Sequence, residues 1–171
     1  MSEDLRDAAI AVLDACRARG LKVATAESCT GGLVAGALTD IAGSSDVLDR
    51  GFVTYSNEAK QQMLGVSGET LRVYGAVSRQ TAEEMARGAI AHSNADLAVA
   101  ITGIAGPGGG GKDKPVGLVH FAVAARSGAL THKEMRYGDI GRAEVRAKSV
   151  LQALAMLKES AENAEPKALK T

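Results

Sequence analysis

The chain has 171 residues, 46% of them hydrophobic, and its 20 basic and 20 acidic residues give a formal net charge of zero. This length and composition fit one globular domain with a sizeable core. Zero net charge, no tryptophan and only 3% aromatic residues argue against a nucleic-acid partner, which usually needs a basic surface and stacking platforms. No apolar run reaches the roughly 18 residues of a membrane span. The start Met1–Asp4 is acidic, unlike a signal peptide, so we expect a cytoplasmic protein without a membrane partner.

Cysteines and histidines give no sign of a metal site. Cys16 and Cys29 are the only two cysteines, and their spacing matches neither a metal motif nor a redox motif. His92, His120 and His132 lack the spacing of zinc ligands. We therefore expect no metal, no cofactor and no disulfide framework.

The N-terminal part alternates helix and strand patterns. An apolar stripe over residues 3–19 predicts a helix, with Ser2 as its N-cap. The run 21–24 predicts a strand, and apolar residues at helical spacing from Leu33 onward predict a second helix. Between them lies the hydroxyl- and glycine-rich turn 25–32.

The middle of the chain continues this alternation. Residues 51–56 are β-branched and aromatic, which predicts a strand. Asn57 is a candidate cap for a short helix over 58–64 that carries Lys60. A second short helical piece is expected over 67–74, followed by a longer helix that Ser78 caps.

In the C-terminal part the strands follow one another directly. The continuous apolar run 97–101 predicts a strand buried on both faces. Strands over 116–125 and 130–137 form a predicted hairpin, and a helix over 141–162 closes the fold. We expect an α/β fold, a three-layer α/β/α sandwich with a mixed central sheet. The domain spans 1–162, and 163–171 form a flexible C-terminal tail.

The turn Thr25–Gly32 is the first candidate site. It leads from a strand into a helix, where free backbone N–H groups and the positive end of the helix dipole can bind an anion or an oxyanion. Ser28 and Cys29 are both possible nucleophiles at this turn. The structural alternative is that Ser28 only caps the following helix.

The glycine-rich segment 102–111 is the second candidate. It does not open a helix and does not end in Gly-Lys-Ser/Thr, so it matches neither the dinucleotide fingerprint nor the P-loop. Beside Thr102, at the end of a buried strand, its backbone can form a nest for a phosphate. The alternative is a flexible crossover between two strands.

A serine nucleophile would need a base other than histidine here. A lysine whose pKa is lowered by burial can serve, and Lys60 follows a strand that we expect in the same sheet, with Tyr55 near that strand's end. By itself, the sequence favours an ordinary surface lysine at position 60. Arg142 or Arg146 of the last helix can bind a phosphate, or both arginines can be solvated helix residues.

Four ordered segments resemble a known family. Residues 26–32 (AESCTGG), 51–60 (GFVTYSNEAK), 75–78 (GAVS) and 102–108 (TGIAGPG) are similar to the CinA C-terminal domain family. The resemblance extends from about residue 5 to 160. It implies an amidohydrolase that deamidates nicotinamide mononucleotide to nicotinic acid mononucleotide and ammonia in pyridine nucleotide recycling.

The resemblance also implies roles for single residues. Ser28 corresponds to the nucleophile, Lys60 to the general base and Tyr55 to a hydroxyl that assists proton transfer. We expect the substrate-binding set to be Cys29, Thr30, Gly31, Gly32, Thr102, Gly103, Gly106, Arg142 and Arg146. A homodimer is expected because many small α/β enzymes complete their pockets across an interface. The competing hypothesis is a non-catalytic domain that binds a nucleotide or a protein and is linked to competence or DNA damage.

Overall fold

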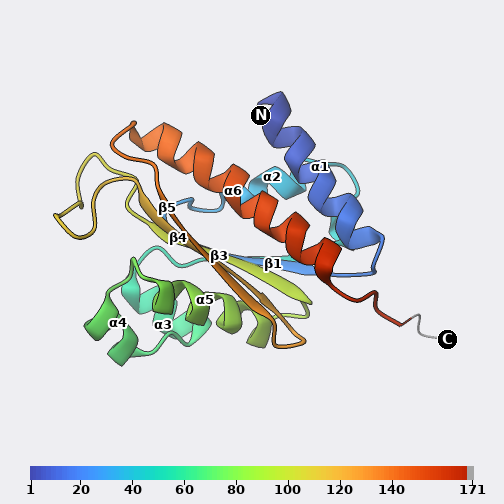
Figure 1. The fold of residues 1–171 in the computed structure, drawn as a ribbon. Coiled ribbons are helices and arrows are strands. Elements are labelled where there is room, and N and C mark those ends of the chain that lie inside the picture. The colour runs from blue at the N-terminus through green and yellow to red at the C-terminus, as the bar shows by residue number, and fades with distance from the viewer. Residues whose placement is uncertain (169–171) are drawn as a thin grey trace.

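A five-stranded mixed sheet forms the centre of the computed structural model, which describes residues 1–168 (Figure 1). The strands are β1 (Val23–Glu27), β2 (Leu48–Val53), β3 (Leu97–Gly103), β4 (Leu118–Ala125) and β5 (Leu130–Arg136). Their spatial order is β2-β1-β3-β4-β5. Strand β1 is parallel to β2 and β3, whereas β4 runs antiparallel to β3 and β5 antiparallel to β4. The expected mixed sheet is confirmed.

Helices cover both faces of the sheet and complete the three-layer α/β/α sandwich (Figure 1). One face carries α1 (Glu3–Arg17), α2 (Leu33–Thr39) and α6 (Arg142–Asn163). The other face carries α3 (Asn57–Leu64), α4 (Gly68–Tyr74) and α5 (Arg79–Ala91). A short 3-10 turn, η1 (Ser44–Asp46), precedes β2. None of the helices in residues 1–168 combines the length and the apolar character that crossing a bilayer requires.

Two hydrophobic clusters lie on the two faces of the sheet. Alternate residues of a strand point to opposite faces, so Val99 and Phe121 join the cluster beneath α1 and α6. Their neighbours Ala100 and Ala122 join the cluster beneath α5. The α5 side of the central strands is built largely from alanine, and these small side chains let that layer approach the sheet closely.

Several element boundaries differ from the sequence expectation. Strand β1 extends to Glu27, and β2 ends at Val53, so Tyr55 lies beyond the strand. The N-cap of α3 is Ser56 and not Asn57, because the Ser56 hydroxyl accepts a hydrogen bond from the Ala59 N–H at 3.0 Å. The caps Ser2 and Ser78 are confirmed, since their hydroxyls accept from Leu5 and Thr81.

The segment after α6 is held against the domain as far as it is described. The Lys167 N–H donates to the Arg19 carbonyl at 3.0 Å, and the Lys167 ammonium pairs with Asp96 at 2.9 Å. The expected flexible tail 163–171 therefore has anchoring contacts up to Lys167, and residues 169–171 lie outside the described part of the chain.

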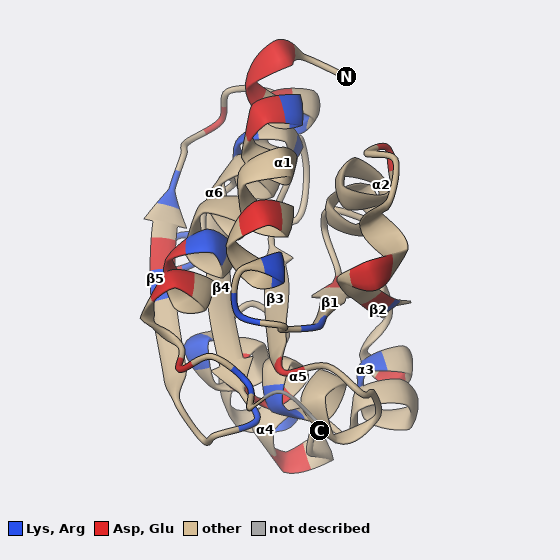
Figure 2. Cartoon of the chain, turned by 90° about the vertical axis from the view of Figure 1, so that its right-hand side faces the viewer, with Lys and Arg blue, Asp and Glu red and all other residues tan. Residues whose placement is uncertain are grey.

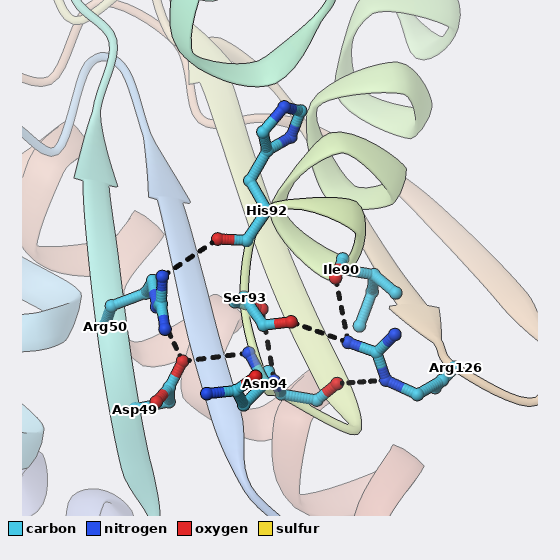
Figure 3. A network of polar contacts seen from close by, with 8 residues as sticks. Asp49, Arg50, Ile90, His92, Ser93, Asn94 and Arg126 are labelled. Atoms are coloured by element: carbon cyan, nitrogen blue, oxygen red, sulfur yellow. Dashed lines mark hydrogen bonds and ion pairs between the residues drawn. The ribbon is translucent and has the colours of Figure 1, made fainter.

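Loops at the end of the sheet away from the Ser28 turn are fixed by charged side chains. Arg126 donates to the backbone carbonyls of Ile90, Ser93 and Ala95, which follow one another around the end of α5 (Figure 3). Arg50 of β2 reaches the His92 carbonyl in the same region. Basic and acidic residues are mixed along the helices and strands (Figure 2), in line with the zero net charge.

Candidate active site

The turn after β1 has a backbone that only glycine adopts readily. Gly31 and Gly32 have φ values of +58° and +102°, in the left-handed region that costs other residues energy. Gly32 is the N-cap of α2. The alternative that Ser28 caps this helix is therefore wrong, and its side chain is free for another role.

The carboxylate of Glu27, the last residue of β1, accepts hydrogen bonds from the first turn of α2. This fully buried carboxylate accepts hydrogen bonds from the Thr30 hydroxyl at 2.6 Å, the Val34 N–H at 2.9 Å and the Ala35 N–H at 3.1 Å. A carboxylate is favourable beside the positive end of a helix. Because Glu27 uses these N–H groups, they are not available to an anion, contrary to the simplest expectation for a strand-to-helix turn.

Lys60 lies beside Ser28 in the interior of the protein. Its Nζ is 3.1 Å from Ser28 Oγ, 2.9 Å from the Thr54 carbonyl oxygen and 3.4 Å from the Tyr55 carbonyl oxygen. The side chain comes from the first turn of α3, and the residue is only 1% exposed. An ordinary surface lysine at position 60 is thereby excluded.

The surroundings of Lys60 favour its neutral form. Burial lowers the pKa of the amine below its usual value, and the neighbouring Cys29 opposes that shift. Burial of an ammonium without a counter-ion disfavours its charged form, and the pKa of the amine falls. The carboxylates next to the two residues in sequence point away from the amine. Glu27, which precedes Ser28, binds the start of α2, and Glu58, two residues before Lys60, accepts a hydrogen bond from Gln62.

Cys29 is buried beside the same amine, but its thiol is held protonated. Burial raises the pKa of Cys29 to about 11, and the charge of Glu27 acts in the same direction. The thiolate is the reactive form of cysteine, so at neutral pH very little nucleophile is present at this position. The chemistry at the turn therefore favours Ser28.

Arg142, the first residue of α6, connects two other loops of the site. Its guanidinium donates to the Gly106 carbonyl and to the Tyr55 hydroxyl, both at 2.9 Å. Tyr55 is 59% exposed, and its contact with Lys60 is through the backbone carbonyl. The structure thus directs the Tyr55 hydroxyl toward Arg142, while its main chain faces the amine.

Arg146 lies one turn further along α6 and contacts the Ser28 turn. Its Nε donates to the Cys29 carbonyl at 3.1 Å, and its Nη2 to the Thr30 carbonyl at 3.4 Å. Arg142 and Arg146 are therefore not merely solvated helix residues. Thr102 donates its hydroxyl to the Ala76 carbonyl at 2.8 Å, which ties the loop before α5 to the end of β3.

A cavity of about 260 Å³ connects these groups. It is lined by the candidate residues Ser28, Cys29, Tyr55, Lys60, Thr102, Gly103, Gly106 and Arg142. Thr30, Gly31, Gly32 and Arg146 are not part of its lining. Its lining also includes residues without a role assigned from the sequence, namely Asn57, Ala76, Val77, Ile104, Ala105, Gly108 and Gly109.

A larger hollow of about 780 Å³ lies elsewhere, between the β4–β5 hairpin and the C-terminal half of α6. It contains none of the candidate residues. The smaller cavity is the candidate active site, because the Ser28 hydroxyl and the buried Lys60 amine meet there. Within residues 1–168, no group of three or more His, Cys, Asp or Glu side chains is arranged to hold a metal ion.

The fold and this site define a known protein class. The family profile described as the CinA C-terminal domain matches residues 5–161, so the chain belongs to that family. The nicotinamide-nucleotide amidohydrolase PncC of Escherichia coli K12 is 56% identical over 144 residues, covering 84% of this chain and 86% of that protein. The enzyme of the same name from Enterobacter agglomerans is 54% identical over 141 residues, covering 81% and 86%.

Solved structures agree with this assignment. The competence/damage inducible protein CihA from Agrobacterium tumefaciens superposes with a TM-score of 0.92 at 59% identity, covering 95% of this chain and 98% of that one. A CinA superfamily protein from Klebsiella pneumoniae has a TM-score of 0.88 at 40% identity, covering 94% and 99%. A putative competence-damage inducible protein from Caldicellulosiruptor bescii is 50% identical over 135 residues, which are 78% of this chain but 33% of that longer protein.

Proposed function

We propose that this protein is an amidohydrolase that converts nicotinamide mononucleotide to nicotinic acid mononucleotide and ammonia. The observation that carries the proposal is the 3.1 Å contact between Lys60 Nζ and Ser28 Oγ at a shared cavity. Relatives at 54–56% identity carry the name nicotinamide-nucleotide amidohydrolase. A carboxamide is a poor electrophile, so its hydrolysis requires an activated nucleophile and stabilisation of the oxyanion.

Backbone carbonyls orient the base. A neutral amine has two N–H donors and one lone pair, and the carbonyl oxygens of Thr54 and Tyr55 accept the two donors. The lone pair is then directed toward the third neighbour, Ser28 Oγ. When Lys60 is neutral, the Ser28 hydroxyl therefore donates a hydrogen bond to the amine. This is the arrangement that general-base catalysis needs.

The reaction proceeds in two steps. In the first step, Ser28 Oγ attacks the amide carbon while its proton passes to Lys60. The Lys60 ammonium then gives this proton to the amide nitrogen, so that ammonia leaves and an acyl-serine ester remains. Lys60, neutral again, takes a proton from water, whose hydroxyl attacks the ester. Breakdown of this second intermediate returns the proton to Ser28 and releases the carboxylic acid.

The backbone next to Ser28 supplies an oxyanion donor. The Ser28 N–H donates to the Ile101 carbonyl, whereas among residues 1–168 no backbone carbonyl accepts from the Cys29 N–H, and only the thiol of Cys29 itself lies within its reach. The residue after a serine nucleophile commonly provides such a donor. Cys29 lines the cavity, so we assign it this role through its main chain.

The phosphate of the substrate is bound at the other end of the cavity. Arg142 uses two of its N–H groups for Gly106 and Tyr55, and a guanidinium has five. The remaining donors, together with the backbone around Gly103, Gly106 and Gly108, form a cationic wall suited to a phosphate. Thr102 supports this wall through its contact with the Ala76 carbonyl.

The biological setting is also part of the proposal. Deamidation of the mononucleotide belongs to pyridine nucleotide recycling, and we infer a cytoplasmic enzyme that works as a homodimer. The mechanism places no demand on a metal or an organic cofactor, because Lys60 performs both proton transfers.

The test is product analysis with purified protein. Wild-type enzyme should convert nicotinamide mononucleotide to equimolar ammonia and nicotinic acid mononucleotide, and Ser28→Ala should produce neither above background. A wild-type protein that binds the mononucleotide without releasing ammonia would instead support the competing hypothesis of a binding domain.

A further inference from the structure

The catalytic turn is held from two sides by charged residues outside the cavity wall. Glu27 binds the turn from the α2 side through the Thr30 hydroxyl. Arg146 binds it from the α6 side through the carbonyls of Cys29 and Thr30. Nothing in the proposed chemistry uses either side chain, although both touch the segment that carries Ser28.

Arg146 fixes the orientation of two peptide planes of the turn, one directly and the other through a hydrogen bond. A peptide unit is planar, so fixing a carbonyl also fixes the N–H of the next residue. The carbonyl of Thr30, which Arg146 holds, shares its plane with the Gly31 N–H, and that N–H donates to the Ser28 carbonyl at 3.0 Å. The Ser28 carbonyl in turn shares its plane with the Cys29 N–H. Arg146 therefore sets the direction of the donor that we assign to the oxyanion.

Glu27 fixes the same turn relative to the helix behind it. Its fully buried carboxylate links the Thr30 hydroxyl to the N–H groups of Val34 and Ala35. Hydrogen bonds to a charged acceptor are worth roughly twice those between neutral groups. The turn between them contains two glycines with positive φ, and without such anchors a glycine-containing turn has many accessible conformations.

We propose that Glu27 and Arg146 are positioning residues that together hold the Ser28 turn so that the Cys29 N–H points at the developing oxyanion. Arg146 thereby acts through the backbone of the turn and not on the substrate phosphate. This inference rests on the proposed function for its natural substrate, but the contacts that carry it are independent of which amide is cleaved.

The experiment compares Arg146→Lys and Glu27→Gln with two matched controls. Arg126→Lys alters a guanidinium that also holds loop carbonyls, but at the other end of the molecule (Figure 3). Asp96→Asn alters a carboxylate that accepts the Lys22 N–H near the start of β1. Each control carries the same chemical change as its partner without touching the turn.

Positioning makes a specific kinetic prediction. Arg146→Lys and Glu27→Gln should lower kcat by about 10- to 100-fold, the range expected when reacting groups are misaligned, with KM unchanged within about twofold. The same factor should be lost with the mononucleotide and with the corresponding riboside, which has no phosphate. Both controls should retain wild-type kcat. A rise in KM that is confined to the mononucleotide would make Arg146 a phosphate ligand and overturn its positioning role.

A second measurement separates this inference from the choice of substrate. A fluorophosphonate reagent reacts when Ser28 Oγ bonds to phosphorus, fluoride leaves and the serine proton passes to Lys60, and the phosphoryl oxygen uses the oxyanion donor. Labelling of Ser28 should slow in both turn variants and not in the controls, even if nicotinamide mononucleotide is not the substrate. Wild-type labelling rates in both variants, or no labelling of Ser28 in any protein, would refute the inference.

Discussion

At the scale of single residues, the candidate site contains a buried lysine that has no carboxylate partner within residues 1–168. Lys60 is 1% exposed, and its amine contacts one hydroxyl and two main-chain carbonyls. Burying an ammonium in such surroundings is unfavourable, whereas burying a neutral amine with its hydrogen bonds satisfied costs much less. The interior therefore lowers the pKa of Lys60, toward the neutral form that a general base requires.

This selection has a measurable effect on stability. Because the pKa of Lys60 is lowered in the folded protein, the unfolded chain binds more protons between the folded pKa and the usual value of 10.5, so stability rises with pH across that window. Lys60→Met lacks this titration. Denaturant unfolding at several pH values should show the wild type gaining stability relative to Lys60→Met as pH rises toward 10.5. A constant difference would mean that Lys60 titrates normally.

A second prediction at this scale concerns the attacking atom. Cys29→Ala should retain activity within about threefold, because the pKa of its thiol, raised to about 11, leaves little thiolate at pH 7. Ser28→Ala should lose at least about a thousandfold in kcat, as expected for removal of a nucleophile. Ammonia release by the two variants distinguishes them, and an inactive Cys29→Ala beside an active Ser28→Ala would reverse the assignment.

Tyr55 provides a third test. Its main-chain carbonyl contacts Lys60 and its hydroxyl accepts a hydrogen bond from Arg142. Tyr55→Phe keeps the carbonyl, so kcat should fall by less than about tenfold, which is below the 10²–10⁴ range typical of a lost proton donor. A kcat loss of a thousandfold or more in steady-state assays would restore the hydroxyl as a proton carrier.

At the scale of elements, the position of Lys60 depends on the contact between α3 and α5. Gly88 of α5 lies against the end of α3, where a Cβ at position 88 would be 2.0 Å from the Leu64 carbonyl oxygen. No side chain fits there without moving one helix. Since α3 carries Lys60, this close approach helps to fix the distance between Lys60 Nζ and Ser28 Oγ.

Gly88→Ala should therefore affect both stability and catalysis. Overpacking of this kind costs about 1–3 kcal/mol, measurable by urea unfolding, and a displaced α3 should also lower kcat. Gly36→Ala in α2 is the matched control, because a Cβ there meets nothing within 4 Å and alanine is favoured over glycine in a helix by about 0.5–1 kcal/mol. Equal stabilisation by both substitutions would contradict the close approach.

Element type was predictable from the sequence because periodicity and caps are local signals. The strand patterns, the buried run of β3 and the Ser78 cap all appear in the structure. The burial of Lys60 was not predictable in this way, because it depends on the packing of α3 against α5 and on its contacts with the segments after β1 and β2. The helix pattern around position 60 is equally compatible with a surface lysine.

Within the candidate site, too, some features could be predicted from the sequence and others depend on the folded structure. The motif residues Ser28, Thr102 and Gly106 line one cavity, and the family resemblance had implied a common site for them. The hydrogen bonds from the start of α2 to Glu27 were missed, although Glu27 adjoins Ser28, since a carboxylate seven residues before Val34 does not have the usual spacing of a capping side chain. Only the folded turn brings the two together.

At the scale of the whole molecule, the site lies at the carboxyl ends of the parallel strands β1, β2 and β3. The turn after β1, the segment after β2 and the glycine-rich segment after β3 meet there, which is the usual place for ligands in open α/β sheets. Helix α6, which lies on the same face of the sheet as α1 and α2 (Figure 1), supplies Arg142 and Arg146 to this region from its first turns. The segments after these three strands, the loop before α5, and the helices α3 and α6 thus line a single cavity.

The central claim is that Lys60 transfers protons and does not merely provide positive charge. Lys60→Arg keeps the charge, but arginine stays protonated in proteins and cannot act as a base. Ammonia release from nicotinamide mononucleotide should be measured for wild type and Lys60→Arg from pH 6 to 9, with folding checked by circular dichroism. The wild-type rate should rise with pH as Lys60 loses its proton, and folded Lys60→Arg should be nearly inactive throughout. Close to full turnover by Lys60→Arg would contradict the mechanism.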